Sequence, residues 1–157
     1  MRCVVLSLML SLAGVEMASA QEFKAEQIAE VVTLKVAENG ETEEVLTPAE
    51  MVKPGEIVRY TIAWENTLES EIEDMVLEIP LPPQMTYRPG SGASDGVEML
   101  FSANGGESYS ALSGLLVLEE DQSRLAEPQD ITHLKWVFSE PLAPGAQGEL
   151  SYDAVLK

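Results

Sequence analysis

The sequence is poor in the residues from which most metal and redox sites are built. It has one Cys and one His among 157 residues. One Cys can form neither an internal disulfide framework nor a cysteine-based zinc site. Basic residues are also scarce, since 9 Lys and Arg face 27 Asp and Glu, which gives a formal net charge of −18. A charge of this sign repels a phosphate backbone and an anionic membrane surface, so we expect no nucleic-acid partner.

Long apolar runs are absent except at the N-terminus, where residues 4–14 read VVLSLMLSLAG. Arg2 supplies a positive start before this run, and Ala18, Ser19 and Ala20 supply the small residues of a cleavage site. This layout is typical of a secretory signal peptide. The run is about half of the ~20 residues that a transmembrane helix needs. We therefore predict cleavage after Ala20, no transmembrane span in the mature chain, and a periplasmic or secreted location.

Removal of residues 1–20 as a signal peptide leaves residues 21–157 as a single predicted domain, because no linker divides them. This mature chain has no cysteine, since Cys3 belongs to the predicted signal peptide, which is also called the leader below. A chain without disulfides in an oxidising compartment must depend on its hydrophobic core. At this length a domain buries about two thirds of the surface of its unfolded chain, so such a core is feasible. Residues 21–29 have a helix-forming composition without an apolar stripe, and we expect a loose N-terminal arm there.

Apolar and polar residues alternate along most of the predicted mature chain. The stretch 57–65, for example, places Val58, Tyr60, Ile62 and Trp64 on one face. Segments with this pattern, separated by turns rich in Gly and Pro, are residues 29–37, 57–65, 74–79, 97–101, 131–138 and 149–156. One apolar and one wet face on each strand indicates antiparallel sheets. We predict an all-β fold, an immunoglobulin-like antiparallel β-sandwich of about seven or eight strands.

One strand-like segment leaves two alternatives open, and another carries a specific expectation about its edge. Residues 115–118 (LLVL) are apolar on both faces, which fits either a doubly covered strand or a short edge contact. The segment 74–79 is followed by Pro80, Pro82 and Pro83, and these prolines are expected to keep that strand from recruiting a neighbour.

Several stretches together resemble the bacterial conserved-repeat family of unknown function (domain of unknown function number eleven). They are residues 52–56 (VKPGE), 58–62 (VRYTI), 65–67 (ENT), 76–82 (VLEIPLP), 85–87 (MTY), 90–92 (GSG) and 141–145 (PLAPG). The resemblance covers roughly residues 45–157. It implies an immunoglobulin-type sandwich in a secreted or surface protein, and it transfers no catalytic residue.

The aromatic residues give few candidates for a binding surface. Trp64 and Trp136 share the parity of the apolar residues on their strands, which predicts core packing rather than sugar stacking. Tyr87 and Tyr109 lie near predicted loops and are the remaining aromatic candidates. Residues 102–109 (SANGGESY) are similar to the Asp-box hairpin, with Asn104 in the Asp position, and Asn104 joins Tyr87 and Tyr109 as a candidate surface residue. In families that carry it this box is a turn motif, and Asn and Gly tolerate the left-handed conformation that it requires.

The acidic clusters at residues 41–44, 69–74 and 119–121 are expected to be solvated faces. The alternative is that they bind calcium or another cation. No Gly-x-Ser-x-Gly elbow accompanies the single His133, so no catalytic set is expected. The sequence thus predicts an exported, non-enzymatic module without a cofactor that binds a protein or an envelope component. The alternative is an extracellular glycan- or calcium-binding module. A subunit completed by a donated strand is a special case, which loses its motive if residues 29–37 pair within their own sheet.

Overall fold

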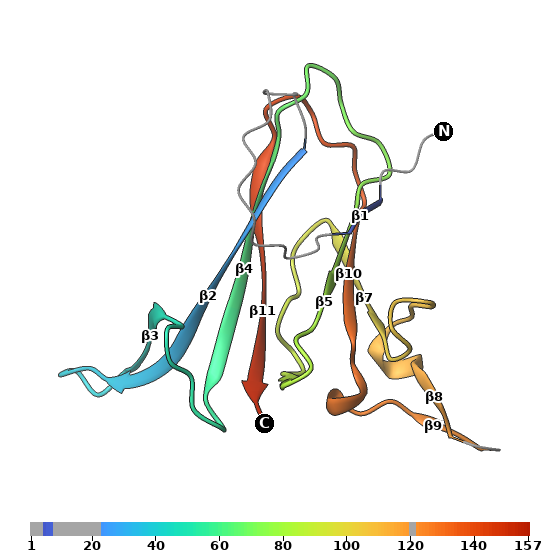
Figure 1. The fold of residues 1–157 in the computed structure, drawn as a ribbon. Helices are drawn as coiled ribbons and strands as arrows, with labels where there is room; N and C mark the ends of the chain where they lie inside the picture. The colour runs from blue at the N-terminus through green and yellow to red at the C-terminus, as the bar shows by residue number, and fades with distance from the viewer. Residues whose placement is uncertain (1–4, 8–22, 120–121) are drawn as a thin grey trace.

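The computed structural model describes residues 5–7, 23–119 and 122–157, and they form an all-β fold (Figure 1). The strands are β1 (Val5–Ser7), β2 (Phe23–Val36), β3 (Thr42–Pro48), β4 (Ile57–Asn66), β5 (Val76–Pro80), β6 (Met85–Tyr87), β7 (Val97–Ser102), β8 (Leu116–Glu119), β9 (Gln122–Leu125), β10 (His133–Phe138) and β11 (Gln147–Leu156). Short 3₁₀ turns cover Leu112–Gly114 and Pro128–Asp130. The predicted cleavage residues Ala18, Ser19 and Ala20 lie outside the described part of the chain.

Two sheets face each other, one on each side of Figure 1. One has the strand order β3-β2-β4-β11-β6, the other has the order β1-β5-β10-β7, and β8 pairs only with β9. All these pairs are antiparallel except β1 with β5. The described residues form eleven strands rather than about seven or eight, because several of the additional ones are too short for alternation to reveal.

The core between the sheets confirms most of the predicted alternation. On β10, Leu134 and Trp136 are fully buried, and Leu77 of β5 is their buried neighbour in the same sheet. Tyr152 of β11 lies opposite, with its ring centroid 6.0 Å from that of Trp136. Burial of each large apolar side chain contributes about 1.5–3 kcal/mol, so this layer dominates the stability of the fold.

The segment predicted as a loose arm is part of a long strand, so that prediction is wrong for residues 23–29. Phe23 begins β2, which pairs with β4 over residues 23–32. Phe23 stacks on Trp64 at 6.2 Å between ring centroids, and Ala25 and Ala29 pack against the core. Alanine contributes little to an apolar pattern, which is why the sequence gives no stripe in this segment.

The apolar face predicted for residues 29–37 does not point into the core. Val31 pairs with Val58, which is buried in the core, so the next residue, Val32, lies on the opposite face of the sheet. Val32 is buried there, 9% exposed, although it lies outside the core cluster, whereas Leu34 and Val36 on the same outer face are 63% and 75% exposed. Beyond Val32 the strand has only β3 as its partner, and the β2–β3 hairpin therefore extends past the sheet. Residues 29–36 thus pair within their own sheet.

The LLVL segment is likewise not doubly covered. Leu115 is buried, whereas Leu116 and Leu118 lie on the β8–β9 hairpin and are 55% and 84% exposed. Arg124 anchors this hairpin through ion pairs of 2.7 Å to Asp130 and to Glu119. The hydrogen bonds from Arg124 lower the pKa of Asp130. The hairpin therefore has a polar anchor and an apolar, uncovered end.

Pro80 ends β5, as its position before a Pro-rich turn predicts, but the strand does recruit a neighbour ahead of the prolines. Val76, Leu77 and Glu78 pair in parallel with Val5, Leu6 and Ser7 of β1. Within the described residues no helix is long and apolar enough to cross a membrane.

Candidate binding surfaces

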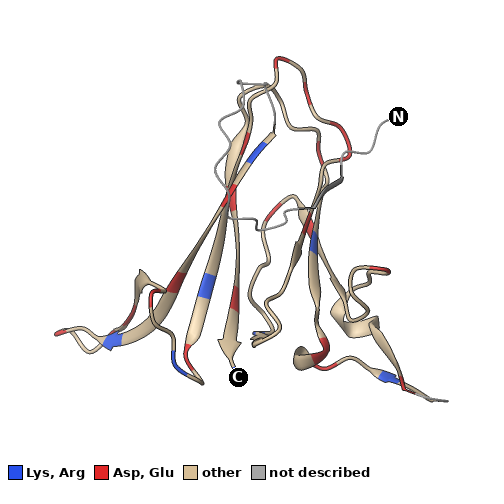
Figure 2. Cartoon of the chain, viewed as in Figure 1, with Lys and Arg blue, Asp and Glu red and all other residues tan. Residues whose placement is uncertain are grey.

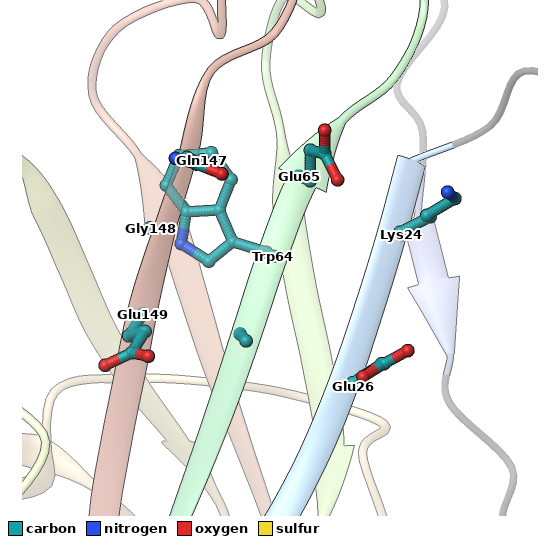
Figure 3. A pocket seen from close by; sticks show the side chains of 8 residues that line it. Lys24, Glu26, Trp64, Glu65, Gln147, Gly148 and Glu149 are labelled. Atoms are coloured by element: carbon teal, nitrogen blue, oxygen red, sulfur yellow. The ribbon is translucent and has the colours of Figure 1, made fainter.

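A hollow of about 610 Å³ lies over β2, β4 and β11 (Figure 3), and Ala63 of β4 is one of the residues that line it. In the sheet register, Ala63 is flanked by Glu26 on one side and by Glu149 on the other. The next row is formed by Lys24, Glu65 and Gln147. A small side chain between longer charged ones creates the depression, which we term the Ala63 hollow.

Trp64 supplies an aromatic surface beside this hollow and is only half-buried, although its parity toward the core is as predicted. Its ring packs edge-on against Phe138 at 5.2 Å between centroids. The ring also lies across Gly148 of β11, where a Cβ atom would come within 2.7 Å of it (Figure 3). Gly148 therefore permits the position of Trp64. Parity alone does not reveal that this ring reaches a hollow open to solvent.

The groups around the Ala63 hollow are carboxylates, one ammonium, one amide and one aromatic ring. This set suits a ligand with many hydroxyl groups, which needs hydrogen-bond partners together with an aromatic face. The described residues contain no group of three or more His, Cys, Asp or Glu side chains that could hold a metal ion. In the predicted acidic cluster 41–44, Glu44 instead pairs with Arg59 at 2.9 Å.

Tyr87, one of the predicted surface candidates, is buried and 2% exposed, so the prediction that it faces a ligand is wrong. Its hydroxyl donates a hydrogen bond to the carbonyl of Ser91, and its ring packs against Phe101. Burial raises its pKa. Residue 87 ends β6, and its proximity to a predicted loop hid the fact that its side chain points between the sheets.

Asn104 is exposed, but its side chain serves the turn that contains it. Its Oδ1 accepts hydrogen bonds from the Ser102 hydroxyl at 2.8 Å and from the Ser108 amide at 3.1 Å. Its Nδ2 donates to the Ser108 hydroxyl at 2.9 Å. Gly105 and Gly106 adopt positive φ in the same turn, as an Asp-box-like hairpin requires.

Tyr109 packs on the outer face of the β5-β10-β7 sheet. The Nζ of Lys135 lies 3.8 Å from the centre of its ring, and the same ammonium pairs with Glu78 at 2.7 Å. The Tyr109 hydroxyl donates to Glu78 at 3.3 Å. Burial and the nearby carboxylate together raise the pKa of Tyr109 to about 12. These contacts hold the 102–109 hairpin against the sheet, and Tyr109 and Asn104 do not meet Tyr87 in one site.

A buried carboxylate, which no local sequence pattern marks, lies on the outer face of β11. Asp153 accepts hydrogen bonds from Arg59 at 2.8 and 3.0 Å and from Arg88 at 3.2 Å. The hydroxyl of Ser91 accepts a hydrogen bond from the Asp153 backbone amide at 3.0 Å. The pKa of Arg59 is raised, first by its hydrogen bond to Asp153. The network closes the loop after β6 onto β11.

The largest departure from an ordinary soluble surface is apolar. Most of the exposed large apolar side chains lie on β2 and on the two hairpins, namely Ile28, Leu34, Val36, Leu46, Leu116, Leu118 and Leu125, and Met51 in the loop after β3 is a further one. Figure 2 shows Asp and Glu along most strands and loops, whereas Lys and Arg occupy a few isolated positions. The β2–β3 and β8–β9 hairpins thus carry uncovered apolar groups on an otherwise acidic molecule.

Searched against protein-family models, curated proteins and solved structures, the chain gives no match.

Proposed function

We propose that the chain is an exported, non-enzymatic module of immunoglobulin-like type that acts by contact with another protein or with a component of the cell envelope. Export rests on the leader-like residues 1–20, and the family assignment rests on the resemblance to the conserved-repeat family. The observation that carries the proposal is the exposure of Leu34, Val36, Leu116 and Leu118 on two hairpins. Apolar side chains exposed together, as Leu34 and Val36 are on one hairpin and Leu116 and Leu118 on the other, are typical of interaction sites.

The proposed contact is tested with a double variant, Leu116→Ser with Leu118→Ser, used as bait against an envelope fraction. We expect the purified exported form of the wild type to retain a specific partner and the double variant to lose it. A matched control, Ser123→Ala on β9, changes a polar residue of the same hairpin and should retain the partner. Equal retention by all three proteins, or hydrolase activity in the wild type, would contradict the proposal.

Export is tested separately by fractionation and by N-terminal sequencing of the isolated protein. The expected N-terminus is Gln21 in a periplasmic or secreted fraction. A full-length chain that remains in the cytoplasm would exclude this part of the proposal.

The Ala63 hollow favours a second candidate function, an extracellular glycan-binding module. Glu26, Glu149 and Gln147 would bond the hydroxyl groups of a sugar, and the part of the Trp64 ring that reaches the hollow over Gly148 would contact the sugar ring. A glycan array followed by calorimetry is the test, with Trp64→Ala expected to abolish binding and Gly148→Ala to weaken it by displacing the indole. A blank array, together with no heat on addition of calcium, would remove both forms of this alternative.

A further inference from the structure

β5 has two neighbouring strands in its sheet, β10 on one side and β1 on the other, and β1 belongs to the predicted signal peptide. In the described residues its outer side pairs only with Val5–Ser7. If the leader is removed as proposed above, β5 becomes an edge strand. Edge strands present unpaired N–H and C=O groups and are templates for the addition of another strand.

The hydrogen-bonding alternation shows which backbone groups this edge offers. The Phe138 amide donates to the Met75 carbonyl, and the Leu81 amide donates to the Thr132 carbonyl, so odd-numbered residues of β5 face β10. The backbone groups of Val76 and Glu78 therefore point to the opposite side, toward β1. Pro80 lacks an N–H, so the ladder at this edge cannot extend far beyond Glu78.

A groove of about 380 Å³ begins where the backbone ladder ends. Ile79, Leu81 and the neighbouring prolines form one wall, and Gln27, Ala29 and Tyr60 of the facing sheet contribute to the other. The lining is mainly apolar. A strand that ran parallel to β5, as β1 does, would pass Val76 and Glu78 first and then reach this groove.

The residues of the added strand that pair with Leu77 and Ile79 would face the core, because paired residues share a face of the sheet. Those positions require apolar side chains. The outward positions would lie near Glu78 on a molecule of net charge −18, which disfavours acidic residues. The β3 edge of the facing sheet is a poorer acceptor, since it carries Glu43 and Glu44 and ends at Pro48.

We propose that the exported form uses the edge of β5 and the adjoining groove to take up an extended, apolar, non-acidic segment of a partner protein as a parallel strand. The inference rests on the proposed function, in which the leader is removed and the module binds another protein. A donated strand could not add to β2 in the same way over residues 30–32, because β2 is already paired there with β3 on one side and β4 on the other.

The probe is a labelled synthetic peptide with the sequence of residues 4–8 (VVLSL) between lysines. We expect saturable binding to the exported form and at least tenfold slower hydrogen exchange of the Val76 and Glu78 amides. The full 157-residue chain should bind at least tenfold more weakly, since its own leader occupies the edge. Equal binding by the two forms, or unchanged exchange of both amides, would overturn the proposal.

Ala29→Glu places a charge in the groove and should weaken peptide binding at least tenfold. Ala93→Glu, the same change on the loop before β7, at the other side of the sheet, is the matched control and should leave binding unchanged. A peptide with proline at its centre (VVPSL) should not bind, and this test stands even if Ala29→Glu does not fold. Binding of the proline peptide would overturn the proposal.

Protection of the same amides in a dimer of the exported form, without peptide, would also overturn it, because the occupant would then be a second copy. Loss of peptide binding with unchanged partner retention by the β8–β9 hairpin would refute this inference alone. Loss of both would refute the proposed function as well.

Discussion

The layer between the sheets and the two projecting hairpins contain the same kinds of residue in opposite surroundings. Trp136 and Leu134 are fully buried against the facing sheet, whereas Leu34 and Leu118 are largely in solvent. Both pairs belong to strands rich in apolar residues. The difference lies in the partner: β10 has a neighbour on each side and a sheet across from it, while β8 has only β9. An apolar strand sequence therefore predicts burial only when the register of the strand and the layer that faces it are also known.

The largest expected effect tests the buried side of this comparison. Trp136→Ala should lower the free energy of unfolding by about 3–5 kcal/mol, because truncation of a buried aromatic leaves a cavity. Its indole donates to the Gly92 carbonyl at 3.3 Å, and this bond is lost as well. Urea unfolding of the exported form measures the change. Leu118→Ala is the control, and a cost for it as large as for Trp136→Ala would remove the distinction between the two regions.

The next largest effect is expected at Asn66, where the loop after β4 meets the loop before β11. Its fully buried Nδ2 donates to the carbonyls of Leu142, Ser70 and Ala143, and its Oδ1 accepts from the Leu68 amide. Asn66→Ala leaves these groups without that partner, which should cost about 1–3 kcal/mol. Asn104→Ala, at an exposed turn, is the matched control and should cost less. Equal midpoints in urea for the two variants would contradict the assignment of Asn66 as an anchor.

A smaller effect, visible only in alkaline solution, is expected for Tyr109. An unfolded tyrosine has a pKa of about 10, and the folded value is about 12. The neutral phenol is favoured in the folded state, so this contribution is complete below pH 10 and is lost as the pH rises toward 12. The stability of Tyr109→Phe should therefore fall less than that of the wild type between pH 8 and pH 11, as measured by urea unfolding. Parallel losses for both proteins would show that Tyr109 plays no part in the alkaline transition.

Alternation predicted the all-β class and the core residues of the strands between the sheets, because those strands present strongly apolar residues at every second position. It failed where the apolar set was weak or faced the other way. Ala25 and Ala29 in β2 gave no pattern, although β4 holds that segment in the sheet. Val32, Leu34 and Val36 gave a clear pattern, but the strand register decides which face they occupy. Val32 pairs with Ile57, which is not part of the core cluster, so the three side chains lie on the outer face of the sheet. Register depends on partners distant in the chain, and local periodicity does not contain it.

The candidate surfaces were harder to predict than the fold for a related reason. The Ala63 hollow is assembled from three strands, and its depth comes from Ala63 and Gly148, which carry no chemical signal. Tyr87 looked available because it precedes a loop, yet its ring enters the core. Asn104 lies in the turn that the Asp-box-like motif predicts, because that motif is local and the hydrogen bonds of Asn104 stay within the turn. Local motifs were readable from the sequence, whereas surfaces built across strands were not.

The smallest expected effect on stability concerns the hairpins, whose exposed apolar residues carry the proposed function. Leu34→Ser should change the free energy of unfolding by no more than about 0.5 kcal/mol, because the side chain is already 63% exposed. It should nevertheless raise solubility in high salt, where the repulsion between acidic molecules is screened and exposed apolar groups can associate. Light scattering at low and high salt measures this, with Thr33→Ser on the opposite face of β2 as the control. If Leu34→Ser destabilised the fold as strongly as Trp136→Ala, the hairpin would be part of the core, and its apolar residues would need no partner to explain them.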